Sequence, residues 1–360
     1  MGVKLRLEGV SKSWEDFHLR QIEMEVDNGE YFVLLGPTGA GKTLLLETIM
    51  GYHTPDSGRI TLNGRDLSEM PPSERNIGYV PQTPSLSMDM TVRENMEYSL
   101  KRRRIAEKWN IAVNGILQVM GLKEIEDRKA LYLSGGERRK LALARVLITE
   151  PDAILLDEPL NSIDAGKKMQ LQNDLQMIHR YLDLTVIHVT HDKQEAYSLG
   201  ERMGIMINGA LLQTGEPENI YSQPNSREVA EFLGYENIYE VKVRGRLDSY
   251  TKVDLGSNSV NVKQDAEGER YHAIIWNHDV QYSTNYYRDI NTNTLQGVVE
   301  EVQDRGPLVT VVADIGVTIR STVLKSTYNQ TPIKKGDKAY FSFKAEDVKL
   351  IPIKQSEERE

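Results

Sequence analysis

Residues Gly36–Thr43 read Gly-Pro-Thr-Gly-Ala-Gly-Lys-Thr, and this octet decides the fold of the first part of the chain. It fits the phosphate-binding loop pattern G-x-x-x-x-G-K-[ST] at every fixed position. An apolar run, Tyr31–Leu35, leads into it, and a helix-forming run, Leu44–Met50, follows it. This strand–loop–helix context predicts a site for nucleotide phosphates rather than a glycine-rich turn that merely precedes a helix.

The chemistry of the loop follows from its residue types. Its glycines let the backbone curl so that successive N–H groups point at phosphate oxygens, and the helix start adds a positive dipole end. We expect Lys42 to reach the β- and γ-phosphates of ATP and the Thr43 hydroxyl to hold Mg²⁺. The residues expected to contact the nucleotide here are Gly36, Pro37, Thr38, Gly39, Ala40, Gly41, Lys42, Thr43 and Leu44.

Composition narrows the class of protein. The 360 residues are 39% apolar and 27% charged, which is typical of a soluble globular protein with room for two domains. The net charge of −9 argues against a general nucleic-acid binder, and the absence of cysteine excludes disulfides and thiolate sites. No apolar run of about 20 residues is present and the start lacks a signal peptide's apolar block. We expect a cytosolic protein that works at a membrane only by docking onto another protein.

The pattern of apolar and polar residues changes near residue 235. Up to that point short apolar runs alternate with longer helical stretches, which predicts an α/β domain over residues 1–235 with a parallel-sheet core. A helical insertion is expected at about residues 91–133. The predicted strands are 31–35, 153–156 and 185–189, and the predicted helices are 92–106, 112–120, 136–148, 166–181, 216–221 and 226–233.

Residues 236–360 carry strand-like stretches without long helices, separated by turns rich in Gly, Asn and Asp. This pattern predicts a second, all-β domain of one or two small barrels. The predicted strands are 238–243, 260–262, 272–276, 295–302, 308–313, 316–323 and 338–343.

A second nucleotide element is the apolar run Ala153–Leu156 followed by Asp157 and Glu158. Ligands of parallel sheets bind at the carboxyl ends of the strands, and neighbouring residues there can point to different sides. Asp157 can therefore face the Mg²⁺ shell while Glu158 faces the γ-phosphate and polarises the attacking water.

A third element, Leu133-Ser-Gly-Gly-Glu137, opens a predicted helix. Ser134 is a suitable N-cap, and Gly135 and Gly136 permit close backbone approach to an anion. By itself this stretch could be only a helix start.

Together the three elements are the signature of ATP-binding cassette (ABC) ATPases, which the chain resembles over its first ~235 residues. The resemblance implies four further site residues. Trp14 stands where that family stacks an aromatic ring on adenine, and Gln82 matches the glutamine that senses γ-phosphate and Mg²⁺. Asp164 matches the loop after the carboxylate strand, and His191 matches the switch histidine. The catalytic set is then Lys42, Gln82, Glu158 and His191, with Thr43, Gln82 and Asp157 at the metal.

Each of these residues also has an ordinary structural interpretation. Trp14 could be a half-buried aromatic, Gln82 could cap a turn, and a lone histidine after a strand, such as His191, is usually structural. His188 lies inside the predicted strand, and we assign it to the core.

Three stretches depart from the common family pattern. Glu137–Lys140 replaces the frequent glutamines and arginine, and Asn161-Ser-Ile precedes Asp164. Thr83–Met90 replaces an aromatic-Pro-His segment that relatives often carry. The first two leave the catalytic set intact, whereas the third affects which permease the chain would engage.

The chain holds one phosphate loop and one signature. In the resembled family, the signature of one copy closes over ATP held by the loop of the other copy. The resemblance therefore implies a two-fold dimer, or half of a heterodimer, with two ATP molecules between Lys42 of one chain and the Ser134 helix end of the other. Hydrolysis would let the dimer open, and the Gln82 loop would carry that motion to a membrane partner.

The stretches 293–302 and 332–350 resemble the oligonucleotide-binding-like (TOBE/MOP-like) barrel of importer ATPases, which also occurs as a molybdate-binding module. An oxyanion site would need N–H, hydroxyl or cationic donors, and Ser321, Thr322 and Lys344 are candidates. A purely structural or dimer-stabilising barrel remains the alternative.

These features predict the ATPase subunit of a prokaryotic importer, most like those for molybdate or tungstate. It would work on the cytoplasmic face of the membrane, as a homodimer on permease subunits served by an extracytoplasmic solute-binding protein. Importers of sulfate, polyamines or sugars remain open, as do an oxyanion sensor and a soluble ABC ATPase without a membrane partner.

Overall fold

The computed structural model describes residues 3–101, 109–161, 165–247, 249–266, 268–286, 289 and 291–353. Within these residues the chain divides into two compact units, Met1–Ile220 and Tyr221–Glu360. The division lies earlier in the chain than the domain boundary expected at residue 235, so helix α8 belongs to the second unit.

The centre of unit 1 is a six-stranded sheet in the order β10-β9-β3-β8-β7-β6. Five of its strands are parallel, and β10 adds an antiparallel edge. Every residue of β3, β7 and β8 is buried, as expected for parallel strands covered on both faces. The strands are β3 (Tyr31–Leu35), β6 (Ile77–Val80), β7 (Ala153–Asp157), β8 (Val186–Thr190), β9 (Arg202–Ile207) and β10 (Ala210–Gly215).

An antiparallel sheet in the order β2-β1-β4-β5 packs with the phosphate-loop side of unit 1 into one apolar core. Strand β2 alternates between buried and exposed residues, so one face of this sheet meets the core and the other meets solvent. The strands are β1 (Val3–Ser13), β2 (His18–Asp27), β4 (Ser57–Leu62) and β5 (Arg65–Asp66).

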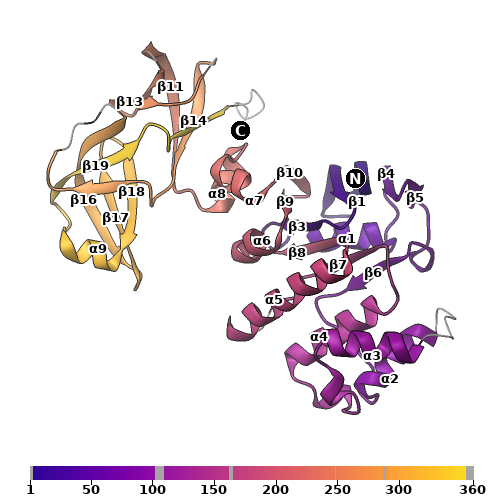
Figure 1. Ribbon diagram of the computed structural model, residues 1–360. Coiled ribbons are helices and arrows are strands. Elements are labelled where there is room, and N and C mark those ends of the chain that lie inside the picture. The colour runs from indigo at the N-terminus through magenta and orange to yellow at the C-terminus, as the bar shows by residue number, and fades with distance from the viewer. Residues whose placement is uncertain are drawn as a thin grey trace. The chain divides into compact units, whose positions relative to one another are not determined.

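Helices cover the parallel sheet, and α2, α3 and α4 gather at the end of unit 1 remote from β1 (Figure 1). Helices α2 and α3 lie within the helical insertion predicted at about residues 91–133, and α4 follows it. The helices are α1 (Lys42–Met50), α2 (Val92–Lys101), α3 (Trp109–Val119), α4 (Gly135–Leu147), α5 (Ala165–Leu182), α6 (Lys193–Leu199) and α7 (Pro217–Ser222), with short 3-10 turns η1 (Pro72–Glu74), η2 (Lys123–Ile125) and η3 (Ala130–Tyr132).

Unit 2 consists of two antiparallel five-stranded sheets, in the orders β13-β12-β11-β14-β20 and β15-β19-β16-β17-β18, around a shared apolar core. Two short helices, α8 (Arg227–Leu233) and α9 (Lys325–Gln330), accompany them. The strands are β11 (Asn237–Leu247), β12 (Tyr250–Leu255), β13 (Asn258–Val262), β14 (Arg270–Ile275), β15 (Gln281–Ser283), β16 (Thr292–Asp304), β17 (Leu308–Asp314), β18 (Thr318–Leu324), β19 (Lys338–Lys344) and β20 (Lys349–Pro352).

Most of the predicted elements lie where the sequence placed them. The helix predicted for 92–106 is helical over 92–101, and its remainder lies outside the described residues. Strands β6, β9 and β10 and helix α6 of unit 1 were not predicted, nor were strands β12, β15 and β20 and helix α9 of unit 2. In the part of the chain that the structure describes, we find no helix long and apolar enough to cross a lipid bilayer.

Candidate functional site

A cleft of about 540 Å³ opens at the carboxyl ends of the central parallel strands. The register pairs Leu35 with Thr190 and Asp157 with Val189, so the segments after β3, β7 and β8 converge there. This edge is where parallel sheets bind their ligands. The lining residues are Phe17, Thr38, Gly39, Gly41, Lys42, Thr43, Leu44, Gln82, Glu158, Asn161 and His191.

The loop between β3 and α1 needs two of its glycines for conformational reasons. Gly39 and Gly41 adopt φ values of +83° and +94°, which non-glycine residues rarely adopt. A Cβ on Gly41 would lie 2.4 Å from the ring of Phe17, whereas a Cβ on Gly39 would meet nothing within 4 Å. The loop is therefore tightly packed on one side and open toward the cleft on the other, as a phosphate cradle requires.

The side chain of Lys42 folds over this loop. Its ammonium group donates hydrogen bonds to the carbonyl oxygens of Gly36 and Pro37, both at 2.8 Å. Burial lowers the pKa of Lys42, and the nearby carboxylates of Glu158 and Asp157 act in the opposite direction. A cation held between carbonyls and facing two carboxylates is suited to exchange those contacts for phosphate oxygens.

Three oxygen donors meet next to Lys42. The Thr43 hydroxyl lies 3.1 Å from both carboxylate oxygens of Asp157, and the Tyr79 hydroxyl donates to Asp157 at 3.3 Å. Burial raises the pKa of Asp157, while the hydrogen bonds from Thr43 and Tyr79 counteract it. Hydroxyl and carboxylate oxygens are the ligands that Mg²⁺ prefers, so these residues fit the metal expected with ATP.

Glu158 is the centre of a side-chain cluster. One of its carboxylate oxygens accepts hydrogen bonds from the amides of Gln82 at 3.1 Å and Asn161 at 2.8 Å. The other lies 3.0 Å from the Nδ1 atom of His191. The structure thus brings together three of the residues predicted to act on the γ-phosphate and adds Asn161 to them.

A buried polar network supports strand β8, which ends one residue before His191. His188 is fully buried, as expected, and its Nδ1 atom lies 2.8 Å from the Tyr31 hydroxyl. Burial alone would raise the pKa of Glu195, but the His188 ring 3.5 Å away and the contacts from Lys168 and Thr190 outweigh it and lower the pKa to about 2. The network therefore keeps a buried carboxylate ionised beside the switch position.

The comparisons with known proteins agree with this geometry. Residues 19–161 match the ABC transporter family. The chain is 36% identical to the molybdate/tungstate import ATP-binding protein WtpC of Pyrococcus horikoshii, over 97% of this chain and 100% of that protein.

The chain belongs to the ABC transporter ATPases.

Two other importer proteins are similar at lower coverage. The spermidine/putrescine import ATP-binding protein PotA of Thermotoga maritima is 33% identical over 84% of each chain. The Fe(3+) ions import ATP-binding protein FbpC of Fusobacterium nucleatum is 33% identical over 73% of this chain and 72% of that protein. Among solved structures, MJ1267, an ATP-binding cassette of an ABC transporter in its ADP conformation, superposes with a TM-score of 0.57 at 27% identity, over 64% of this chain and 98% of that one. This ABC ATPase is accordingly an ATP-binding enzyme coupled to transport.

The aromatic residue that lines the cleft is Phe17, whereas the prediction named Trp14. Trp14 packs edge-on against His53 with ring centres 5.2 Å apart, and its ring lies 6.4 Å from that of Phe17. Both aromatic residues belong to the turn between β1 and β2, which the hydrogen bond from the Trp14 amide to the Phe17 carbonyl closes. The sequence signal was therefore the turn, and the choice of ring within it required the structure.

The signature stretch begins α4 and does not line the cleft of its own chain. Ser134 and Glu137 form a reciprocal capping box: the Ser134 hydroxyl accepts from the Glu137 amide, and the Glu137 carboxylate accepts from the Ser134 amide. A Cβ on Gly135 or Gly136 would meet nothing within 4 Å. This helix end is thus ordered and open to another molecule. Asp164, the remaining predicted nucleotide contact, lies outside the described residues.

The predicted oxyanion donors of unit 2 are a correction. Ser321 is fully buried, and its hydroxyl donates to the carbonyl of Val280. The Thr322 hydroxyl lies 3.0 Å from that of Thr310, and the Lys344 ammonium lies 3.6 Å from a carboxylate oxygen of Glu346. Ser321 is therefore withdrawn from solvent, and Thr322 and Lys344 each contact a different partner.

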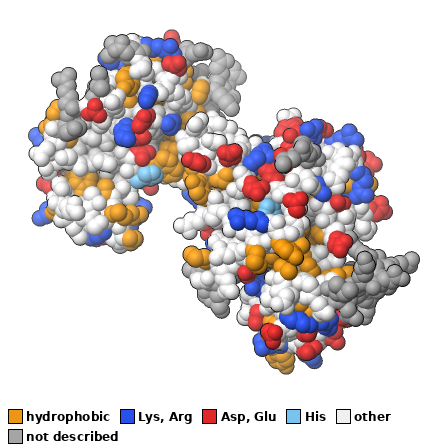
Figure 2. Space-filling model, in the orientation of Figure 1, with side chains coloured by type: hydrophobic (Ala, Val, Ile, Leu, Met, Phe, Trp, Pro, Cys, Tyr) orange, Lys and Arg blue, Asp and Glu red, His pale blue; other side chains and the backbone are white. Residues whose placement is uncertain are grey.

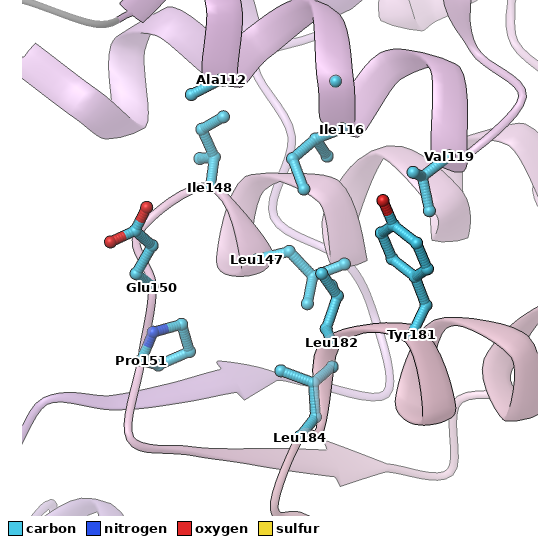
Figure 3. Close-up of a pocket in the computed structure, with 11 residues that line it drawn as sticks. Ala112, Ile116, Val119, Leu147, Ile148, Glu150, Pro151, Tyr181, Leu182 and Leu184 are labelled. Carbon is cyan, nitrogen blue, oxygen red and sulfur yellow. The ribbon is translucent and has the colours of Figure 1, made fainter.

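A separate apolar cavity of about 420 Å³ lies at the opposite ends of the parallel strands (Figure 3). Ile116 of α3, Leu147 at the end of α4 and Tyr181 near the end of α5 point into it from three elements. Glu150 is its acidic member. With this lining the cavity provides none of the phosphate-binding chemistry of the nucleotide cleft.

Proposed function

We propose that this chain is the ATP-hydrolysing subunit of an importer for molybdate or tungstate. The observation that carries the proposal is the similarity to WtpC along nearly the whole chain, combined with a complete cleft around Glu158. The chain is also similar to PotA and FbpC, the import ATP-binding proteins for other solutes. Importers of sulfate, polyamines, iron or sugars are therefore the competing assignments.

ATP would bind with its phosphates on the loop between β3 and α1. Lys42 exchanges its carbonyl contacts for β- and γ-phosphate oxygens, and the backbone N–H groups of residues 38–44 donate to the same anion. The ring of Phe17 covers the loop at Gly41 and offers an apolar face to the base.

Thr43 and Asp157 would hold Mg²⁺ directly or through its waters, with Gln82 nearby. When bound, the ion neutralises charge on the β- and γ-phosphate oxygens. The residues of this chain orient around that position: Tyr79 fixes one oxygen of Asp157, and Thr43 approaches both.

Glu158 would be the general base. It accepts a proton from the water that attacks the γ-phosphorus, the bond between that phosphorus and the bridging oxygen breaks, and ADP leaves with that oxygen. Gln82 and Asn161 hold the carboxylate, and His191 turns toward the γ-phosphate from the same cluster.

The active form would be a dimer of this chain around two ATP molecules. The open helix end at Ser134–Gly136 supports this proposal, because it carries an ordered N-terminus that its own cleft does not use. The second copy would supply these groups, together with Asp164, to the nucleotide.

The dimer would act at the cytoplasmic face of the membrane, on permease subunits supplied by an extracytoplasmic solute-binding protein. The segment after Gln82 would transmit closure to the permease. Acidic and basic side chains are interspersed on the face drawn in Figure 2, which favours a protein partner over nucleic acid. Unit 2 would be an OB-like regulatory domain of the TOBE/MOP type.

The test is ATPase activity of the complex reconstituted with its cognate permease and binding protein. Molybdate or tungstate should stimulate hydrolysis from the outer side, while sulfate, spermidine, ferric ion and maltose should not. Stimulation by one of those four alone would reassign the substrate. Failure to co-purify with any integral membrane protein would instead favour a soluble ABC ATPase. Feedback through unit 2 predicts that millimolar molybdate or tungstate on the cytoplasmic side lowers the rate.

A further inference from the structure

Arg139 lies in the second turn of α4, in the stretch where the signature departs from the common family pattern. Its guanidinium group donates hydrogen bonds to three backbone carbonyls of the loop after β7, those of Glu158, Pro159 and Asn161. The contact to the Glu158 carbonyl measures 3.2 Å. One side chain of the signature helix therefore holds the segment that carries the proposed base.

The held segment contains a backbone conformation that needs support. Glu158 adopts a φ of +46°, in the left-handed region that is strained for a non-glycine residue. Within the loop, the backbone N–H of Asn161 donates to the Glu158 carbonyl at 3.2 Å. The side-chain amide of Asn161 donates to the Glu158 carboxylate at 2.8 Å. Fixing the carbonyls of this turn therefore also fixes the direction of the carboxylate.

The arginine side chain is chemically suited to this task. Its planar fork presents five donors in fixed directions, so one group can serve several carbonyls at once, whereas a lysine ammonium is a point charge on a flexible stem. Burial lowers the pKa of Arg139, and the charge of Glu195 opposes that shift. A guanidinium remains protonated under these conditions.

We propose that Arg139 is a positioning residue for Glu158, and that it couples the Ser134 end of α4 to the base of its own cleft. This inference rests on the proposed function, which makes Glu158 the base and places the Ser134 end on ATP held by the second copy. Closure of α4 onto that ATP is then transmitted through Arg139 to the Glu158 loop of the same chain. Nucleotide at one site thereby sets the base at the other.

The test compares Arg139→Gln and Arg139→Lys with Lys140→Gln in the full chain. Lys140 is the next residue of α4, and its ammonium pairs with Asp174 of α5 at 2.6 Å, away from the base loop. A displaced base loses rate while phosphate binding persists, so kcat should fall about 100-fold in Arg139→Gln and about tenfold in Arg139→Lys, with the Kd for ATP within about twofold. Lys140→Gln should keep both values.

A second measurement reports on the loop without turnover. The backbone N–H of Asn161 donates to the Glu158 carbonyl, which also accepts a hydrogen bond from Arg139. Its hydrogen exchange without nucleotide should accelerate about tenfold in both Arg139 variants and stay unchanged in Lys140→Gln. If Arg139→Gln fails to fold, Arg139→Lys, which keeps the charge and the stem, decides the matter.

Normal kcat and normal Asn161 exchange in a folded Arg139→Lys variant would overturn the proposal. Loss of ATP binding in parallel with kcat would also overturn it, because the residue would then support the domain as a whole. A wrong assignment of Glu158 as the base would give a different result, because the Glu158→Gln variant would then still hydrolyse ATP. If Glu158→Gln is inactive and the Arg139 variants are normal, the base stands and the coupling through Arg139 is wrong.

Discussion

The Nδ1 atom of His191 lies 3.0 Å from a carboxylate oxygen of Glu158. The two residues come from the ends of neighbouring parallel strands, β8 and β7, and the side chain of His191 is about half exposed to the cleft. The histidine that is expected to contact the γ-phosphate is thus in direct contact with the proposed base.

His191→Ala should therefore reduce kcat about 100-fold while ATP still binds, since the phosphate loop is untouched. Phosphate release and calorimetric ATP binding measure the two effects. His278→Ala, which removes an exposed histidine of unit 2, is the matched control. Equal losses in binding and turnover would assign His191 to nucleotide affinity instead.

Tyr79→Phe should weaken Mg²⁺ binding, because it removes the hydroxyl that donates to Asp157 at 3.3 Å. Loss of one hydrogen bond to a carboxylate corresponds to roughly a tenfold rise in the Mg²⁺ concentration needed for half-saturation. Calorimetric titration of Mg²⁺ into the ADP-bound protein measures it. Tyr52→Phe, whose exposed ring lies edge-on to Tyr79 at 6.2 Å, should leave the titration unchanged. An unchanged Mg²⁺ titration of Tyr79→Phe would show that this hydroxyl does not support the metal site.

Glu195→Gln should destabilise the protein at pH 7 by up to about 3 kcal/mol. The folded-state pKa of Glu195, about 2, lies below the ordinary value of 4.5. The ionised group therefore contributes its full stabilisation above about pH 4.5, and this contribution is lost as the pH falls toward 2. Urea unfolding of both proteins from pH 7 down to the lowest pH at which they fold should show a shrinking difference. A difference that stays constant with pH would contradict the assignment.

Phe17→Ala should raise the KM for ATP about tenfold, since base–aromatic stacking contributes about 1–3 kcal/mol. Trp14→Ala should have a smaller effect, because Trp14 packs on Phe17 and His53 rather than lining the cleft. Steady-state KM values for the two variants decide between the rings. A larger effect at Trp14 would restore the interpretation suggested by family resemblance.

The phosphate loop, the Asp157–Glu158 pair and the helix start at Ser134 could be predicted from sequence because each is a local pattern with its own backbone requirement. His188 was correctly assigned to the core for a similar reason, as it lies within a fully buried strand. Tyr79 and Arg139 could not be identified, because their roles arise from contacts between different elements of the chain. Asn161 lies only three residues after Glu158, and its role depends on the backbone conformation of the turn between them.

Two residues of unit 2 show where prediction from residue type fails. Strand β12 escaped prediction because a polar residue, Thr251, occupies a core position, where its hydroxyl donates to the Gln264 carbonyl at 2.7 Å. Ser321 was taken for an anion donor on residue type alone, and its burial beneath the chain at Val280 removes it from solvent. Residue types predict what a side chain can do, but only the tertiary structure determines which partner it has.

Single-turnover hydrolysis by Glu158→Gln tests the central claim most directly. The variant and the original protein would be mixed with Mg²⁺ and ATP, with release of phosphate and retention of ATP followed together. If Glu158 is the general base, the original protein releases phosphate, while Glu158→Gln binds ATP, remains dimeric and releases essentially none. Phosphate release by Glu158→Gln at the rate of the original protein would contradict it.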